Sequence, residues 1–210
     1  MSALSIEEVC RLAPVVPVLV IEDLDKAVPL AEALVAGGLR ALEVTLRTPI
    51  ALKAIRAIAD AVPDAEIGVG TLLTADDVKA SVDAGARFGV SPGCTDTVLD
   101  AADAAGLPML PGVATPSEAM AAADRGLKIL KFFPAEANGG AAVLSAWASP
   151  LAGLKFCPTG GVSEKNARDY LSLPNVVCVG GSWVAPKSAI ADGDWNTITR
   201  ISKEACALSA

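Results

Sequence analysis

Histidine is missing from all 210 positions of this sequence. Its absence removes Ser-His-Asp triads, three-histidine zinc sites and the iron site made of two histidines and a carboxylate. An enzyme that acts on carbonyl groups without histidine lacks the ligands of the usual zinc Lewis acid. The composition therefore directs any such chemistry toward lysine and carboxylates, and we expect neither a bound metal nor a cofactor.

Aromatic residues and positive charge are also scarce. Phenylalanine, tryptophan and tyrosine make up 4% of the chain, the formal net charge is −7, and the basic residues form no block. Proteins that bind nucleic acid carry a basic patch, so nucleic-acid partners have little support. A protein with this charge must bind an anionic small molecule through a local positive site, built from a few side chains and backbone N–H groups.

Cysteines are few and scattered, and none form a C-x-x-C pair: Cys10, Cys94, Cys157, Cys178 and Cys206. This distribution argues against a disulfide framework or a zinc knuckle and favours a reducing compartment. Met1–Arg11 has acidic residues where a signal peptide would have basic ones. The apolar run Val15–Ile21 is too short to cross a membrane. We therefore expect a cytoplasmic protein that does not engage a membrane.

Short β-branched runs alternate with alanine-rich stretches, and their repeat of about 20–26 residues matches a compact β-α unit. The expected strands are Val15–Val20, Ala41–Leu46, Glu66–Thr71, Phe88–Ser91, Met109–Gly112, Ile129–Phe133, Leu154–Thr159 and Val176–Gly180. The expected helices are Asp25–Ala36, Pro49–Ala61, Ala75–Ala84, Asp96–Ala105, Pro116–Ala123, Ala141–Ala148 and Glu164–Leu171. This α/β pattern over residues 1–210 predicts a single (β/α)8 TIM barrel with a short N-terminal helix. The second possibility is a doubly wound open sheet.

Lys131 lies inside the apolar expected strand Ile129–Phe133. A fixed ammonium group is costly there, because burial disfavours the charged form of an amine. A neutral amine can attack a carbonyl group and form a Schiff base. A lysine that extends to solvent, or one that pairs with an acid, would give the same pattern without catalysis. Lys128 and Lys155 stand at the amino ends of their strands, so Lys131 is the lysine expected at the catalytic end of a barrel.

The second expected strand carries two charges on one face. Side chains alternate along a strand, so Glu43, Thr45 and Arg47 share one side, and the leucines and valine between them share the other. If the apolar side faces the helices, a carboxylate and a guanidinium group point toward the mouth of the barrel. An ion pair with a purely structural role remains the alternative on this strand alone.

Glycine pairs follow the last two expected strands, in Thr159-Gly160-Gly161 and in Gly180-Gly181-Ser182. Many barrels bind phosphate at these two positions through exposed backbone N–H groups, so we expect a phosphate site here. Gly70-Thr71 indicates a close backbone approach and a hydroxyl group at the same mouth. Ser91-Pro92-Gly93, taken alone, is typical of a turn.

As an ordered set, these stretches closely resemble the class I family of KDPG (2-keto-3-deoxy-6-phosphogluconate) aldolase and 4-hydroxy-2-oxoglutarate aldolase. The resemblance covers essentially the whole chain, and its motif positions show no departure. The matching stretches are Gly37–Arg40, Leu42–Arg47, Gly70-Thr71, Ser91–Gly93, Pro111-Gly112, Lys131–Glu136, Cys157–Gly161 and Gly180–Trp183.

The resemblance implies a role for each motif residue. Lys131 is similar to the family's Schiff-base lysine, and Glu43 to its proton shuttle. The residues that look like contacts to the pyruvoyl group or lining of its pocket are Arg47, Thr71, Pro92 and Phe133. The residues that look like the phosphate grip are Thr159, Gly160, Gly161, Gly181 and Ser182.

The implied activity is reversible cleavage of KDPG to pyruvate and D-glyceraldehyde 3-phosphate, the aldol step of the Entner–Doudoroff pathway. It implies a metal-free homotrimer and side activity on 4-hydroxy-2-oxoglutarate. The galactonate-derived epimer remains an alternative substrate. A phosphosugar isomerase or epimerase that forms no covalent intermediate, and a barrel that only binds a sugar phosphate, remain the competing functions.

Overall fold

The computed structural model describes residues 4–208, and every strand pairing in it is parallel. One sheet has six strands in the order β5-β4-β3-β2-β1-β9, and the other has three in the order β6-β7-β8. The strands are β1 (Val15–Leu19), β2 (Ala41–Thr45), β3 (Glu66–Gly70), β4 (Phe88–Val90), β5 (Met109–Leu110), β6 (Gly112–Val113), β7 (Ile129–Phe132), β8 (Lys155–Pro158) and β9 (Val179–Gly181).

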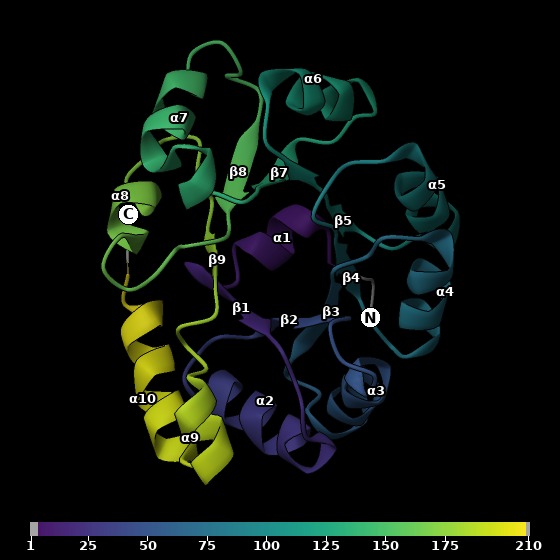
Figure 1. Cartoon of the computed structure of the whole chain (residues 1–210), viewed down its shortest axis with the longest axis vertical. Coiled ribbons are helices and arrows are strands. Elements are labelled where there is room, and N and C mark those ends of the chain that lie inside the picture. Colours follow the sequence, from purple (N-terminus) through teal and green to yellow (C-terminus); the bar gives the residue numbers. More distant parts are fainter. Residues whose placement is uncertain (1–3, 209–210) are drawn as a thin grey trace.

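Most helices lie outside the strands, and Figure 1 shows them as a ring around a curled parallel sheet, whereas the first helix lies in the middle of that ring. The α-helices are α1 (Ile6–Cys10), α2 (Ala27–Ala36), α3 (Ala51–Ala61), α4 (Ala75–Asp83), α5 (Asp96–Ala105), α6 (Pro116–Asp124), α7 (Gly140–Trp147), α8 (Ala167–Leu171), α9 (Lys187–Asp192) and α10 (Trp195–Cys206). Two short 3₁₀ helices are η1 (Leu24–Lys26) and η2 (Glu136–Asn138). The coarser part of the predicted fold, an α/β architecture with a curled parallel sheet, is confirmed.

The sheet differs from the expected eight unbroken strands in two places. The expected strand Met109–Gly112 is split into β5 and β6 at Pro111, which has no N–H to donate to the ladder. The expected strand Val176–Gly180 begins only at Val179, although Val176 forms an isolated bridge to Phe156. A second isolated bridge joins Thr159 to Gly180, so β8 and β9 meet through these single bridges.

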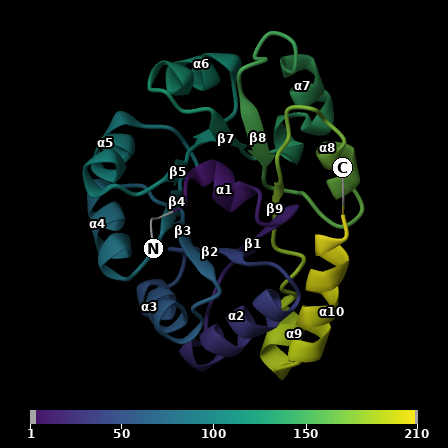
Figure 2. The same ribbon diagram turned by 180° about the vertical axis from the view of Figure 1, so that it is seen from behind.

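The helical predictions misplace the start of one helix by three residues and omit two other helices. Helix α8 begins at Ala167 rather than at Glu164, because the Ser163 N–H donates to Asn166 Oδ1 at 2.7 Å and closes a turn first. Helices α9 and α10 were not predicted at all. Helix α10 packs beside α2, on the side of the molecule where α9 also lies (Figures 1 and 2).

The strands separate two hydrophobic clusters by the alternation of their side chains. Leu42 and Val44 of β2 face the surrounding helices, as do Leu130 and Phe132 of β7. The opposite faces contribute to an inner cluster that also contains Val9 and Cys10 of α1, so α1 covers one end of the space between the strands. Other members of the inner cluster are Val16, Ala41, Phe88, Val90, Leu110, Ile129, Cys157 and Cys178.

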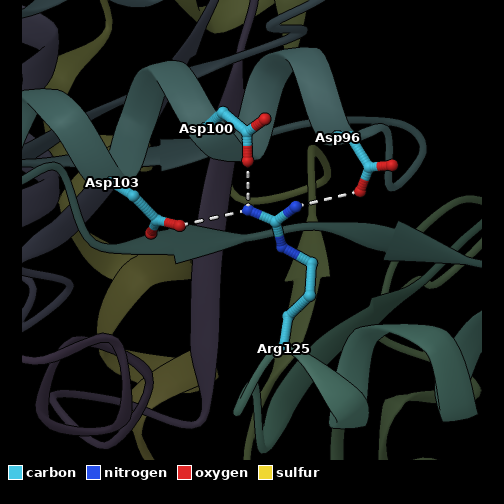
Figure 3. A network of polar contacts seen from close by, with 4 residues as sticks. All are labelled: Asp96, Asp100, Asp103 and Arg125. Atoms are coloured by element: carbon cyan, nitrogen blue, oxygen red, sulfur yellow. Dashed lines mark hydrogen bonds and ion pairs between the residues drawn. The ribbon is translucent and has the colours of Figure 1, made fainter.

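Arg125 connects two neighbouring helices of the outer ring. It follows α6, and its guanidinium group contacts three carboxylates of α5, those of Asp96, Asp100 and Asp103, at 2.9, 2.6 and 3.2 Å (Figure 3). The three aspartates lie on one face of α5 because their spacing follows the helical turn. Hydrogen bonds to these carboxylates, that of Asp100 above all, raise the pKa of Arg125 further above its ordinary value.

Candidate active site

Lys131 and Glu43 form a buried pair at the carboxyl ends of their strands. Lys131 Nζ lies 3.5 Å from Glu43 Oε1, and the two residues are only 3% and 2% exposed. On the inward-facing side of β7, Lys131 follows Ile129, and on that of β2, Glu43 follows Ala41. Ile129 and Ala41 belong to the inner cluster, so the pair lies directly above that cluster. Glu43 Oε1 makes no hydrogen bond to any described residue. It can therefore exchange a proton with water or with a bound molecule.

Glycines of β3 provide the space for this pair. A Cβ atom at Gly70 would collide with the carboxylate of Glu43, and one at Gly68 would collide with the ring of Phe88. Ile67 and Val69, between them, face the helices and belong to the outer cluster. The strand thus keeps an apolar outer face, while its inner face carries no side chain where the carboxylate lies.

The other residues expected near the reacting carbon also gather here. Arg47 Nε donates a hydrogen bond to Thr71 Oγ1 at 3.2 Å. Thr71 has a φ of 67°, an unfavourable backbone conformation for a β-branched residue. The ring centroid of Phe133 lies 4.9 Å from Lys131 Nζ. Pro92 lies in the turn after β4, and its carbonyl lies where a Cβ at Gly112 would stand.

A cavity of about 260 Å³ opens beside this centre. Arg47 and Phe133 lie on its wall, and Phe133 is next to Lys131 of the buried pair. Its wall also includes all five residues expected to bind phosphate: Thr159, Gly160, Gly161, Gly181 and Ser182. The structure thus brings the predicted phosphate residues to one wall and the predicted carbonyl chemistry close to another part of the same cavity.

Glu136 supports the first glycine loop from below. Its N–H donates to the carbonyl of Gly160 at 3.0 Å, and its carboxylate accepts a hydrogen bond from the hydroxyl of Tyr170. A Cβ at Gly161 would collide with the side chain of Glu136, so glycine is needed for this close approach. Burial first, then the hydrogen bond and charge of Glu136, raise the pKa of Tyr170. The phenol therefore keeps its proton and remains the donor.

Some residues of the cavity were missed by the sequence analysis. Val18 and Val20 flank the end of β1, and Ile190 comes from the unpredicted helix α9. Lys187, the first residue of α9, also lines the cavity. A lysine placed just after the loop of the second glycine pair was the available signal. Lys155, by contrast, is the first residue of β8, and its amine donates to Pro174 O at 2.7 Å, away from this cavity.

Neither a membrane segment nor a metal centre is evident in the described part of the chain. Among residues 4–208, no helix combines the length and apolar character needed to span a bilayer. In the same residues, side chains of histidine, cysteine, aspartate and glutamate form no group of three or more suited to a metal ion.

The fold and this centre define a class: an α/β protein with a curled parallel sheet and a buried lysine–carboxylate pair beside a cavity with glycine-rich loops. Within that class, the chain belongs to the KDPG and KHG aldolase family, whose sequence model matches residues 6–201. The KHG/KDPG aldolase of Escherichia coli is 52% identical over 201 residues, which cover 96% of this chain and 94% of that protein.

Solved structures agree with this membership. The KDPG aldolase of Legionella pneumophila, with pyruvate captured at low pH as a covalent carbinolamine intermediate, gives a TM-score of 0.93 at 47% identity. The alignment covers 96% of this chain and 98% of that one. The Zymomonas mobilis KDPG aldolase with 3-phosphoglycerate gives 0.93 at 48% identity, and covers 99% of this chain and 98% of its own.

Proposed function

We propose that this protein is a class I aldolase, a lyase that reversibly cleaves 2-dehydro-3-deoxy-6-phosphogluconate (KDPG) to pyruvate and D-glyceraldehyde 3-phosphate. The observation that carries this proposal is the buried pair, with Lys131 Nζ 3.5 Å from Glu43 Oε1 beside the cavity. Relatives named KDPG aldolase and KHG/KDPG aldolase support the substrate class. The Legionella protein, captured with covalent pyruvate, supports the chemistry.

In the first half of the reaction, the neutral amine of Lys131 attacks the C2 ketone and forms a carbinolamine. Loss of water gives an imine, and Glu43 moves the protons of this step through water. The protonated imine withdraws electrons from the C3–C4 bond. Positive charge on the imine nitrogen thus does the work that a Lewis-acidic ion does in other aldolases.

Bond cleavage follows from this electron sink. Glu43 removes the proton of the C4 hydroxyl, directly or through water, and the electrons of the C3–C4 bond flow into the imine. Glyceraldehyde 3-phosphate leaves, and an enamine of pyruvate stays attached to Lys131. Protonation of the enamine at C3 restores the imine, and water hydrolyses it to pyruvate and the free amine.

The two ends of the substrate are held by different groups. Arg47 and Thr71 bind the carboxylate of the pyruvoyl half, with Phe133 and Pro92 against its carbon skeleton. The phosphate is bound by the two glycine loops, through Thr159, Gly160 and Gly161 on one side and Gly181 and Ser182 on the other. The location of these loop residues around one cavity, together with the Zymomonas protein that holds 3-phosphoglycerate, supports this assignment.

Reductive trapping tests the proposal. Pyruvate with borohydride should label a single residue, Lys131, as located by peptide mass mapping, because borohydride reduces the imine to a stable amine. Lys131→Ala should lose the label and nearly all cleavage. Lys128→Gln, a change just before the opposite end of β7, is the matched control and should label normally. A label on another lysine, or none, would overturn the assignment.

The same experiment separates the competing functions. An isomerase or epimerase that uses Glu43 without a covalent step, or a protein that only binds sugar phosphates, would give no pyruvate-dependent label. Cleavage of 4-hydroxy-2-oxoglutarate is expected as a side activity. Steady-state rates on the gluconate- and galactonate-derived substrates, which differ only at C4, decide between those two sugars.

The remaining proposals concern the whole chain. Residues 1–210 form one catalytic domain, an eight-unit (β/α)8 barrel in which β5 and β6 together make the fifth strand. The bridges between β8 and β9 support closure on the other side. The described cysteines are free, which suits the cytoplasm. The family resemblance supports a homotrimer, and a solution mass near three times 21.2 kDa would be its measure.

A further inference from the structure

One cation on the cavity wall has no part in the mechanism above. Among the described residues that line the cavity, Arg47 and Lys187 carry the positive charges. Arg47 is hydrogen-bonded to Thr71, beside the centre that binds the pyruvoyl half. Lys187 shares the cavity wall with Gly181 and Ser182, and only four residues separate it from Ser182 in the sequence. A phosphate dianion bound by the glycine loops would therefore have Lys187 as its nearby lysine.

Lys187 is held loosely in this structure. Its Nζ lies 3.3 Å from Glu22 Oε1, and the two side chains are 83% and 67% exposed. Exposed ion pairs of this kind are weak, because water and salt screen the charges and two long side chains must be fixed. Lys187 also borders a second hollow, which Glu22, Asp23 and Lys26 line and which continues from the cavity through Val20, Leu30 and Ile190. The amine can therefore turn from Glu22 toward the cavity.

The helix that carries Lys187 has a separate attachment. Lys26 Nζ donates to the carbonyl of Ala191, near the end of α9, at 2.8 Å. This bond joins α9 to the segment after β1 without using Lys187. The side chain of Lys187 can thus change partners while the helix stays in place.

We propose that Lys187 determines specificity for phosphorylated substrates by leaving Glu22 and pairing with the substrate phosphate. The inference rests on the proposed function, because it takes the glycine loops as the phosphate site. Glu22 then acts as a competitor that holds the amine when phosphate is absent. The competing explanation is that the pair only attaches α9 to the segment after β1. The two explanations predict different effects on phosphate affinity when the Glu22 carboxylate is removed. Removal of a competitor strengthens phosphate binding, whereas loss of an attachment does not.

Phosphate affinity measured by calorimetry, with inorganic phosphate as the probe at low ionic strength, tests the proposal. Lys187→Gln should weaken phosphate binding about two- to fivefold, the range expected for an exposed ion pair. Glu22→Gln should strengthen it by a similar factor. Lys79 and Asp83 on α4 form the matched control, an exposed pair at 2.6 Å that does not border the cavity. Lys79→Gln and Asp83→Asn should leave phosphate affinity unchanged.

Steady-state kinetics provide a second readout. Lys187→Gln should raise KM for KDPG more than it lowers kcat, and should harm cleavage of 4-hydroxy-2-oxoglutarate less, because that substrate has no phosphate. The difference in KM for KDPG between Lys187→Gln and wild type should shrink at high salt, because salt screens the charge of Lys187. Equal phosphate affinity in Lys187→Gln and Lys79→Gln would overturn the proposal, and so would equal losses on both substrates. Failure of borohydride trapping with normal Lys187-dependent phosphate binding would instead overturn the aldolase function alone.

Discussion

The buried pair places two groups of opposite charge where each affects the reactivity of the other. Lys131 and Glu43 are both buried above the apolar inner cluster, and the ring of Phe133, beside Lys131 Nζ, lines the cavity. A carboxylate beside the amine can accept its proton, and Glu43 Oε1, which makes no hydrogen bond to a described residue, is available to do so. The absence of a side chain at Gly70 also matters, because a methyl group there would collide with the carboxylate of Glu43.

Replacement of Glu43 by Gln should abolish the exchange of pyruvate methyl protons with solvent. Glutamine keeps the shape but cannot accept a proton, and a general base commonly contributes about 10²–10⁴-fold. Loss of the methyl signal of pyruvate in D₂O, followed by NMR, gives the rate. Glu66→Gln changes another buried carboxylate, which pairs with Arg87 at the other end of β3, and should retain exchange. Near-normal exchange in folded Glu43→Gln would leave Glu43 a structural partner only.

At this scale, the sequence predicted the strand faces of Glu43 and Lys131 but not all of the cavity wall. Alternation along β2 and β7 correctly placed Glu43 and Lys131 on the inner face, because the apolar residues that alternate with them on each strand pack against the helices. Lys187 was not predicted, because its place depends on the six-residue helix α9, and its one signal in the sequence was its position shortly after the second glycine pair. The roles of the site residues remain predictions until trapping and exchange are measured.

Among the elements, α5 and α6 are joined by a charge arrangement to which both contribute. Asp96, Asp100 and Asp103 repel one another on one face of α5, and Arg125 offsets this repulsion from the end of α6 (Figure 3). Arginine suits this role because its planar group presents several donors to separate carboxylates. The contact also joins two neighbouring β-α units.

Arg125→Gln should lower the melting temperature by about 2 °C or more, because three carboxylates lose their common partner. Thermal unfolding followed by circular dichroism gives the change. Arg200→Gln removes an arginine that pairs with a single carboxylate, that of Glu204, and should have a smaller effect. High salt should narrow the difference between Arg125→Gln and wild type. An equal fall in melting temperature in the two variants would show that three aspartates around one arginine stabilise the protein no more than a single ion pair does.

Element boundaries followed local chemistry where that chemistry was visible. Helix α5 spans the predicted residues Asp96–Ala105, and α4 begins at the predicted Ala75, where Thr74 accepts a hydrogen bond from the Asp77 N–H. The errors arose where a turn competed with a helix, as before α8. They also arose at α9 and α10, the two helices that follow the last strand. Helix α10 was missed although its amphipathic pattern is clear, because eight strand–helix units had already accounted for the expected barrel.

For the whole molecule, the division of the interior decides what chemistry is available. One end of the space between the strands is filled by the inner cluster and covered by α1, and the other end holds the polar centre and the cavity. This division followed from sequence only in outline. The repeat length and the number of strand–helix units predicted parallel β-α units. The contribution of Val9 and Cys10 to the inner cluster, however, depends on long-range packing that no local pattern encodes.

Chelators should leave the rate of KDPG cleavage unchanged, because the molecule offers poor ligands for a catalytic ion. It has no histidine, and three of its cysteines, Cys10, Cys157 and Cys178, are buried in the inner cluster, below Lys131. Hydrogen bonds with Cys10 and Cys157, together with burial, raise the pKa of Cys178. A raised pKa keeps the thiol protonated, whereas a metal binds the thiolate. Activity after incubation with EDTA and removal of the chelator is the measurement, and loss of activity that a divalent ion restores would contradict the Schiff-base mechanism.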